Sequence, residues 1–383
     1  MTHHAFRLNK LSQMLVALGM LATTAVFADA PQMQQGIQLG DMGNGNIIVW
    51  SRSDRKSRMM VEYASNKDFT DSKVIRGPYA MAGTDYTARQ ELSGLPKGQD
   101  IFVKVWFEDL TNARTPSEAV MGSFHTLSND ENVHFVWGGD TAGQGWGINK
   151  AFGGMKIYES MRQVKPNFFI HSGDNIYADG IISETVTAEN GQVWTNVVTP
   201  EVSKIAETQD EFRGRYKYNL LDDNVRRFNS EVPQIWQWDD HEVVNNWSGS
   251  KDLSADTRYV EKNIPTLVAR AFTAFSEYAP LRPYNSTESS RIYRKMSYGP
   301  LLDVFVLDMR SYRGPNSTNL QTKSGAETAF LGREQVAWLQ SELKSSKATW
   351  KVIAADMPIG LNVGDGKDAD GNARWEAIAN IQA

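Results

Sequence analysis

Three observations predict an α/β domain preceded by a smaller all-β domain. Residues 36–127 hold short strand-like runs separated by polar turns. From residue 134 onward, apolar strand-like runs alternate with amphipathic helical stretches, as in α/β folds. Five of those apolar runs end in acidic residues. We divide the 383 residues into a signal segment at 1–30, a β-sandwich domain at 31–128 and an α/β domain at 129–383.

The first 30 residues have the pattern of a cleaved export signal. Arg7 and Lys10 form a basic start, Leu15 to Val26 is apolar, and Ala28-Asp29-Ala30 fits the small-x-small cleavage rule. The apolar part is short for a membrane span, and no other stretch approaches about 20 apolar residues. The sequence therefore predicts a periplasmic or secreted protein without a transmembrane anchor after cleavage.

Composition restricts the possible functions and metal ligands. Removing Arg7, Lys10 and Asp29 from 40 basic and 45 acidic residues leaves 38 and 44, a net charge of −6, so there is no nucleic-acid-binding signal. The chain has no cysteine, which excludes disulfides and thiolate ligands. A metal site must be mostly oxygen-liganded, because four histidines remain after cleavage: His125, His134, His171 and His241.

The all-β domain is predicted from five strand-like runs, at residues 47–50, 59–63, 87–92, 101–107 and 121–126. The fourth run alternates, with Ile101, Val103, Val105 and Phe107 on one face. Short strands at this spacing indicate a two-sheet sandwich of the immunoglobulin or fibronectin kind. No chemically reactive residues gather in it, which favours a structural or positioning role.

The α/β domain follows a polar linker at residues 127–132. Its predicted strands are 134–137, 168–170, 234–238, 301–307 and 350–355, and its predicted helices are 150–164, 210–228, 264–278 and 333–343. Between them, residues 185–205 are polar and β-branched, which is typical of a hairpin-like excursion.

The five strands run into acidic residues at their carboxyl ends: Asp140, Asp174, Asp239/Asp240, Asp308 and Asp356. In an open α/β sheet, that edge is where ligands bind. A single such aspartate is usually a helix cap or turn residue. Five together would repel one another unless a cation lay among them. The pattern therefore predicts a metal site.

Two segments carry the strongest signals. In Gly173-Asp174-Asn175-Ile176-Tyr177, Asp174 could bridge two ions, and Tyr177 could supply a phenolate to an ion as acidic as Fe³⁺. In Asp239-Asp240-His241-Glu242 with Asn245-Asn246, carboxylate and amide oxygens suit Ca²⁺, Mg²⁺ or Mn²⁺, and His241 could give a proton to a leaving alkoxide.

Weaker candidates surround these segments. Asp140 follows Gly138-Gly139, a pair that permits close approach of backbone to ligand. Arg310 and Arg313 could clamp phosphate oxygens, and a structural ion pair explains them equally well. Asp356 and Asp365 are weak candidates by spacing alone.

Taken together, these segments resemble the alkaline phosphatase D (PhoD-like) family of metallophosphoesterases. The matching motifs are Gly173-Asp174-x-x-Tyr177-Ala178-Asp179, Trp238 to Glu242 with Asn245-Asn246, Leu307 to Arg313, and Gly332-x-x-Gln335-x-x-Trp338-Leu339. The resemblance covers nearly the whole mature chain. It implies a four-layer αββα catalytic domain in place of the doubly wound sheet that the pattern alone suggests.

The resemblance also implies a centre that pairs iron with calcium. Asp174 would be the bridging ligand, Tyr177 the ferric ligand, and Asp240 with Asn245 or Asn246 would bind the divalent ion. Some members carry a cysteine in the first motif; here Asp140 stands in its place. The family closes its site with a late Asp-x-His motif that does not occur before Ala383, so we expect a C-terminally truncated domain.

The leading hypothesis is an exported, monomeric, metal-dependent alkaline phosphatase or phosphodiesterase. Metals centred on Asp174 would activate a bound water or oxide for attack on a small phosphate ester, with His241 or Arg310 assisting. The alternative is a non-catalytic metal-binding or scaffold protein that lacks the final histidine motif.

Overall fold

A computed structural model describes residues 30–283, 285, 287–357 and 362–377. The predicted export signal lies outside these residues except for Ala30. In the part of the chain that the structure describes, no helix combines the length and apolar character needed to cross a membrane.

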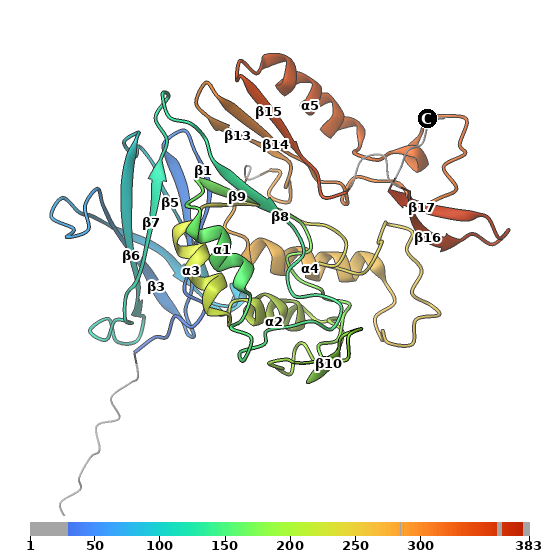
Figure 1. Ribbon diagram of the computed structural model, residues 1–383, viewed down its shortest axis with the longest axis horizontal. Helices are drawn as coiled ribbons and strands as arrows, with labels where there is room; N and C mark the ends of the chain where they lie inside the picture. Colours follow the sequence, from blue (N-terminus) through green and yellow to red (C-terminus); the bar gives the residue numbers. More distant parts are fainter. Residues whose placement is uncertain (1–29, 284, 286, 358–361, 378–383) are drawn as a thin grey trace, which may run out of the picture.

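The N-terminal region consists of seven strands in two layers (Figure 1). One layer contains β1 (Ile37–Gly43), β2 (Asn46–Arg52) and β5 (Thr87–Leu92), and the other contains β4 (Lys73–Ala80), β3 (Ser57–Ala64), β6 (Gln99–Asp109) and β7 (Val120–Thr126). A short 3₁₀ turn, η1 (Ala82–Thr84), joins β4 to β5. The predicted alternation in β6 is confirmed, because Ile101, Val103, Val105 and Phe107 are all buried. Strands β1 and β4 were missed by the sequence analysis.

The first layer continues into the α/β region as one sheet of six strands, in the order β5-β2-β1-β12-β9-β8. The three added strands are β12 (Gln234–Gln237), β9 (Phe168–Ser172) and β8 (Phe135–Gly138), and they are mutually parallel. Strand β1 joins β12 in parallel through the pair Gly40 and Gln234. The sandwich strands and the strands that carry the candidate site therefore share one framework.

A second sheet contains β13 (Arg294–Tyr298), β14 (Leu302–Val306) and β15 (Trp350–Ala354). Phe168, Ile170 and Ile235 of the first sheet share a core with Val304 and Val306 of the second, so the sheets pack against each other. The single doubly wound sheet suggested by the pattern is therefore wrong. Strand β13, which the sequence analysis missed, pairs antiparallel with β14, and β15 pairs parallel on its other side.

Helices cover both sheets (Figure 1). The first sheet packs through Phe169 and Trp236 against a core that includes Phe212, Phe228 and Phe275. The helices on that side are α1 (Lys156–Gln163), α2 (Gln209–Asn219), α3 (Asp223–Glu231) and α4 (Ile264–Tyr278). Beside the second sheet lies α5 (Arg333–Ser345), which follows the 3₁₀ turn η2 (Ala326–Thr328) in the sequence. Its Trp338 packs with residues that follow β14.

Two predicted helices differ from those observed. The helix predicted at 150–164 begins only at Lys156, because Gly153 and Gly154 adopt φ of 96° and 74°. The helix predicted at 210–228 is two helices, because the Asp222 side chain accepts the N–H groups of Asn224 and Val225 and starts α3. The predicted hairpin is confirmed as β10 (Thr185–Thr187) and β11 (Val193–Thr195). A second hairpin, β16 (Val363–Lys367) and β17 (Ala373–Ala377), was not predicted.

Candidate metal centre

The candidate site is built on the loops that follow three neighbouring parallel strands. Strands β8, β9 and β12 end next to one another, and Asp140, Asp174 and Asp240 follow them in the sequence. Backbone bonds tie the first two loops together: the N–H of Asp140 donates to the carbonyl of Gly173 at 3.2 Å, and that of Thr141 to Asp174 at 2.9 Å. The sheet therefore brings together carboxylates that are far apart in the sequence.

The turn after β9 depends on Gly173. This residue has a φ of 81°, and a Cβ atom there would lie 2.5 Å from the Cβ of Asp239. Asp174 follows with a φ of 49°, a left-handed conformation that aspartate adopts more readily than most residues. The glycine thus allows the β9 and β12 loops to approach closely, which sets Asp174 beside Asp240.

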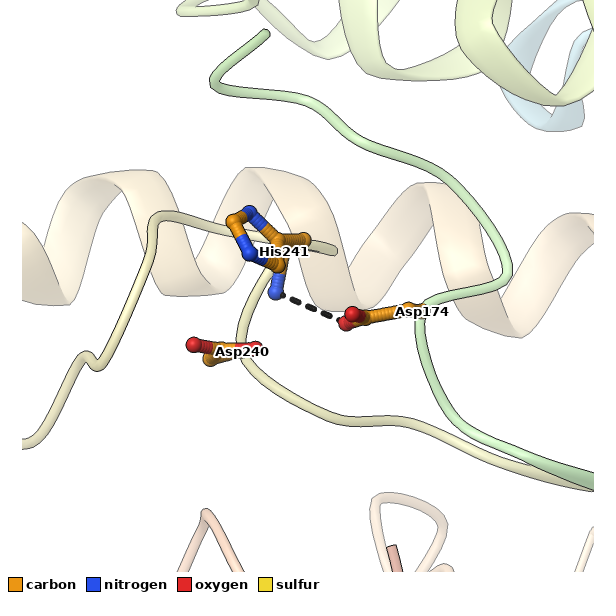
Figure 2. A group of neighbouring side chains, drawn as sticks. All are labelled: Asp174, Asp240 and His241. Atoms are coloured by element: carbon orange, nitrogen blue, oxygen red, sulfur yellow. Dashed lines mark hydrogen bonds between the residues drawn. The ribbon is translucent and has the colours of Figure 1, made fainter. Parts of the chain in front are cut away.

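Asp174, Asp240 and His241 form the core of the site (Figure 2). Each offers one ligand atom, and these atoms all lie within 4.8 Å of one another. The backbone N–H of His241 donates to Oδ1 of Asp174 at 3.2 Å. Both aspartates are buried, with exposed fractions of 6% and 4%. The three side chains come from two loops and converge on a volume that a single ion could occupy.

The charges around Asp174 fit a bound cation. Burial raises the pKa of Asp174 to about 11, and the charges of four neighbours add to the shift: Glu242, Asp240, Asp239 and Asp140. The cost of ionising Asp174 here would fall if a cation lay among these groups. Since the donors are mostly carboxylate oxygens, the site suits hard cations.

Tyr177 joins Asp140 to this core. Its hydroxyl donates to Oδ2 of Asp140 at 2.8 Å, and its ring stacks on the His241 imidazole with centroids 4.2 Å apart. Burial raises the pKa of the Tyr177 phenol above its usual range, and the charge of Asp174 adds to the effect. Without a strongly acidic cation the phenol stays protonated, and it already lies where its oxygen could become a ligand.

His241 is held by Asp179, a motif residue that was not predicted to belong to the site. Its Nδ1 atom lies 2.7 Å from Oδ1 of Asp179, whose Oδ2 accepts the backbone N–H of Asn245 at 2.8 Å. Burial would lower the pKa of His241, but the hydrogen bond and charge of Asp179 raise it to about 9. Asp179 lies five residues after Asp174 and shares no strand or helix periodicity with it, so only its place in the Gly173 to Asp179 motif could have indicated it.

The two asparagines occupy different positions. Asn245 is exposed, and the contact that links it to the site is made by its backbone. Asn246 has a φ of 54°, gives its backbone N–H to Oδ2 of Asp240 and directs its amide nitrogen to the carbonyl of Gly364 at 3.3 Å. The structure therefore places Asn246 against Asp240 and leaves Asn245 at the surface.

Arg310 is a buried residue that forms ion pairs with two carboxylates. Its exposed fraction is 2%, and its guanidinium pairs with Asp239 and Glu376, both at 2.5 Å. These contacts correspond to the structural ion pair that the sequence analysis left open. Of the two interpretations that the sequence left open for Arg310, a phosphate clamp and a structural ion pair, these contacts favour the ion pair.

The last two strand-end aspartates are not part of the Asp174–Asp240–His241 core. Asp308 is fully buried, and its Oδ1 accepts the backbone N–H groups of Arg310 and Ser311 as a turn cap. Asp356 lies beside Asp239; burial raises its pKa well above the usual range, and the charge of Asp239 adds to the shift. Both follow strands of the second sheet, β14 and β15, whereas Asp174 and Asp240 follow strands of the first.

The fold and site together define an α/β protein with a carboxylate-rich candidate metal centre at the ends of parallel strands. Residues 135–382 match the PhoD-like phosphatase family, and residues 20–128 match the N-terminal domain of PhoD-like phosphatases. The chain belongs to the PhoD-like phosphatase family, which confirms the resemblance seen in the motifs.

Individual relatives agree with this assignment. Alkaline phosphatase D of Bacillus subtilis (strain 168) is 31% identical over 208 residues, which are 51% of this chain and 33% of that protein. The chain therefore spans about a third of the length of the curated relative that it matches.

Two solved structures share the fold. A structure of PhoD superposes with a TM-score of 0.68 at 23% identity, covering 91% of this chain and 66% of that one. Purple acid phosphatase PPD1 from yellow lupin (Lupinus luteus) seeds superposes with a TM-score of 0.51 at 14% identity, covering 85% and 50%. At these identities the likeness concerns the fold alone.

Proposed function

We propose that this chain carries the metal-binding core of an exported phosphoesterase that hydrolyses phosphomonoesters or phosphodiesters. The observation that carries the proposal is the convergence of Asp174, Asp240 and His241 at the ends of β9 and β12. The relative named alkaline phosphatase D supports the same class of reaction. Export rests on the signal-like residues 1–30, and we propose a monomer.

The residues present fit a centre of iron and calcium. Asp174 would bridge the two ions, Tyr177 and Asp140 would complete the iron side, and Asp240 with Asn246 would bind calcium. Asn245 is the less favourable asparagine, because it is exposed. When bound, such ions polarise a phosphoryl group and lower the pKa of a water molecule.

The protein itself supplies a proton donor. In the absence of a cation, the hydrogen bond and charge of Asp179 raise the pKa of His241 to about 9, so its imidazole holds a proton at neutral pH while Asp179 holds its Nδ1 atom. In this role His241 is a proton donor, and Asp174 and Asp240 are the members of the core that would hold the ions. The Nε2 atom of His241 makes no hydrogen bond to the residues that the structure describes, so that nitrogen is the one able to protonate a leaving alkoxide. Stacking on Tyr177 fixes the plane of the imidazole.

The finer architecture follows from the same family. We propose that residues 31–128 form a sandwich of the immunoglobulin or fibronectin kind and that residues 129–383 belong to an αββα catalytic domain. The packing of two sheets between helices supports the second assignment.

The test compares two buried aspartates. Asp174 and Asp303 are each 6% exposed, and Asp303 lies in β14, where it accepts a hydrogen bond from Ser346. Wild type, Asp174→Asn and Asp303→Asn are assayed with p-nitrophenyl phosphate and bis(p-nitrophenyl) phosphate. We expect Asp174→Asn to lose about a hundredfold or more in kcat/KM, since it lacks a carboxylate that would hold the ions, while Asp303→Asn keeps its activity.

Full activity of Asp174→Asn would refute the proposal. Metal binding by the wild type without hydrolysis of either ester would instead support the non-catalytic metal-binding protein.

A further inference from the structure

Glu242 is fully buried beneath the candidate site, yet the proposed chemistry does not use it. It follows Asp240 by two residues. Its Oε1 atom accepts the backbone N–H of Asn175 at 2.5 Å and the side-chain Nδ2 of the same residue at 3.0 Å. Its Oε2 atom accepts the backbone N–H of Asp239 at 2.8 Å. One carboxylate thus receives three donors from the two loops that carry the candidate ligands.

The two backbone N–H groups that Glu242 accepts lie next to candidate ligands in the sequence. Asn175 is the residue after Asp174, and Asp239 is the residue before Asp240. The two N–H groups bound by Glu242 are therefore each adjacent in sequence to a candidate ligand. Any change in the reach of this side chain would alter the distance between the loops at that point.

Asn175 adds a second link between the same loops. Its Nδ2 atom also donates to the carbonyl of Gln237 at 2.6 Å, at the end of β12. Its own carbonyl accepts the side chain of Asn219 at 2.8 Å, at the end of α2. Asn175 is 3% exposed, so these bonds are made in a region shielded from water. The loop after β9 is therefore fastened to β12 and α2.

The contact uses both oxygens of Glu242 as acceptors. All three groups that face Glu242 are donors, so each of its oxygens must accept. A glutamine of the same size would offer one oxygen, and its NH₂ group would point at an N–H. A buried donor without an acceptor costs about 1–3 kcal/mol, so the loops would separate or rotate to find other partners.

We propose that Glu242 is a positioning residue that sets the separation of Asp174 and Asp240 and thereby the affinity of the centre for its cation. This inference rests on the proposed function. Glu242 acts through the backbone on each side and does not touch the cation. Residues that orient metal ligands commonly change metal affinity by about 10–100-fold when they are removed.

The test measures Ca²⁺ binding by calorimetry on full-length protein stripped with a chelator. We expect Glu242→Gln to bind Ca²⁺ at least tenfold more weakly than wild type. Hydrogen exchange on the stripped proteins gives a readout that is independent of the ion: the amides of Asn175 and Asp239 should exchange faster in Glu242→Gln, whereas amides of β3 and β6 should not change.

A matched control separates positioning from general destabilisation. Glu277 is also a buried glutamate, 6% exposed, and it pairs with Arg213 at 2.7 Å away from the site loops. Glu277→Gln should lower the free energy of unfolding without changing Ca²⁺ affinity. Glu242→Asp, which keeps both oxygens on a shorter side chain, should recover part of the affinity lost in Glu242→Gln.

If Glu242→Gln does not fold, Asn175→Ala decides the question. It removes the bonds to Glu242 and Gln237 and leaves the backbone donors in place, so a severalfold loss of Ca²⁺ affinity is expected. Unchanged affinity in the variant that folds would overturn the inference. If wild type itself binds no Ca²⁺, the proposed calcium site fails instead, so the two failures are distinguishable.

Discussion

The close approach of two loops at Gly173 gives a prediction whose magnitude can be worked out from the structure. Gly173→Ala would place a methyl group on a residue with a φ of 81° and within 2.5 Å of the Asp239 Cβ. Adopting a left-handed conformation costs a residue with a side chain about 1–2 kcal/mol. Overpacking against a neighbouring backbone adds about 1–3 kcal/mol. The expected loss in the free energy of unfolding is therefore about 2–5 kcal/mol.

A second glycine separates the two contributions. Gly191 has a φ of 80°, and a Cβ there would have nothing within 4 Å. Gly191→Ala should therefore lose only the conformational part, about 1–2 kcal/mol. The difference between the two variants measures the contact with Trp238 and Asp239.

The assay is urea unfolding of both variants and wild type, followed by tryptophan fluorescence and far-UV circular dichroism. Gly173→Ala should lose about 1–3 kcal/mol more than Gly191→Ala. Equal losses of unfolding free energy in the two variants would contradict a close contact at Gly173, because the loop after β9 would then tolerate a side chain without pushing the β12 loop away.

Three further predictions concern charge and metal. The pKa of Glu211 is lowered to about 2: burial opposes the shift, but Lys204 and backbone donors at the start of α2 outweigh it. A lowered pKa in the folded protein contributes stability at pH values above the unfolded value near 4.5, and this contribution is lost as pH falls toward 2. Glu211→Gln should therefore lower the free energy of unfolding by about 0.5–2 kcal/mol at pH 7, and denaturant titrations should show this loss shrinking between pH 5 and pH 3. Arg310→Gln leaves Asp239 and Glu376 buried without their partner and should lower the free energy of unfolding by about 3–5 kcal/mol, whereas Arg310 acting only on substrate would leave urea midpoints unchanged. A chelator should lower the midpoint of thermal unfolding, and restored Ca²⁺ should raise it, since a ligand that binds only the native state stabilises it; an unchanged midpoint would argue against a bound ion.

The sequence predicted that Asp174 and Asp240 would lie near each other, and the structure brings them together. Asp174 and Asp240 follow apolar strands, and such residues gather where parallel strands end side by side. Strands β9 and β12 and helix α4 were predicted nearly to their observed limits, because apolar runs and the Asn263-Ile264-Pro265 start are local signals.

The features of the fold and site that the sequence did not predict depend on tertiary packing. Asp308 and Asp356 also end apolar strands, but those strands belong to another sheet, and the residues of β14 are buried throughout, which gives no alternation to show which sheet they join. Arg310 looked available for a phosphate because nothing in its neighbourhood reveals Glu376, 66 residues later, as its partner. Strand β4 was missed because Gly77 and Pro78 interrupt its pattern.

We propose that Asp174 holds a metal ion between the loops of β9 and β12. The most direct test is the metal content of purified wild type, Asp174→Asn and Asp303→Asn by inductively coupled plasma mass spectrometry, after dialysis against metal-free buffer. We expect bound iron or calcium in wild type and in Asp303→Asn, with at least one equivalent lost in Asp174→Asn. Equal metal content in all three proteins, or none in wild type, would contradict the proposal.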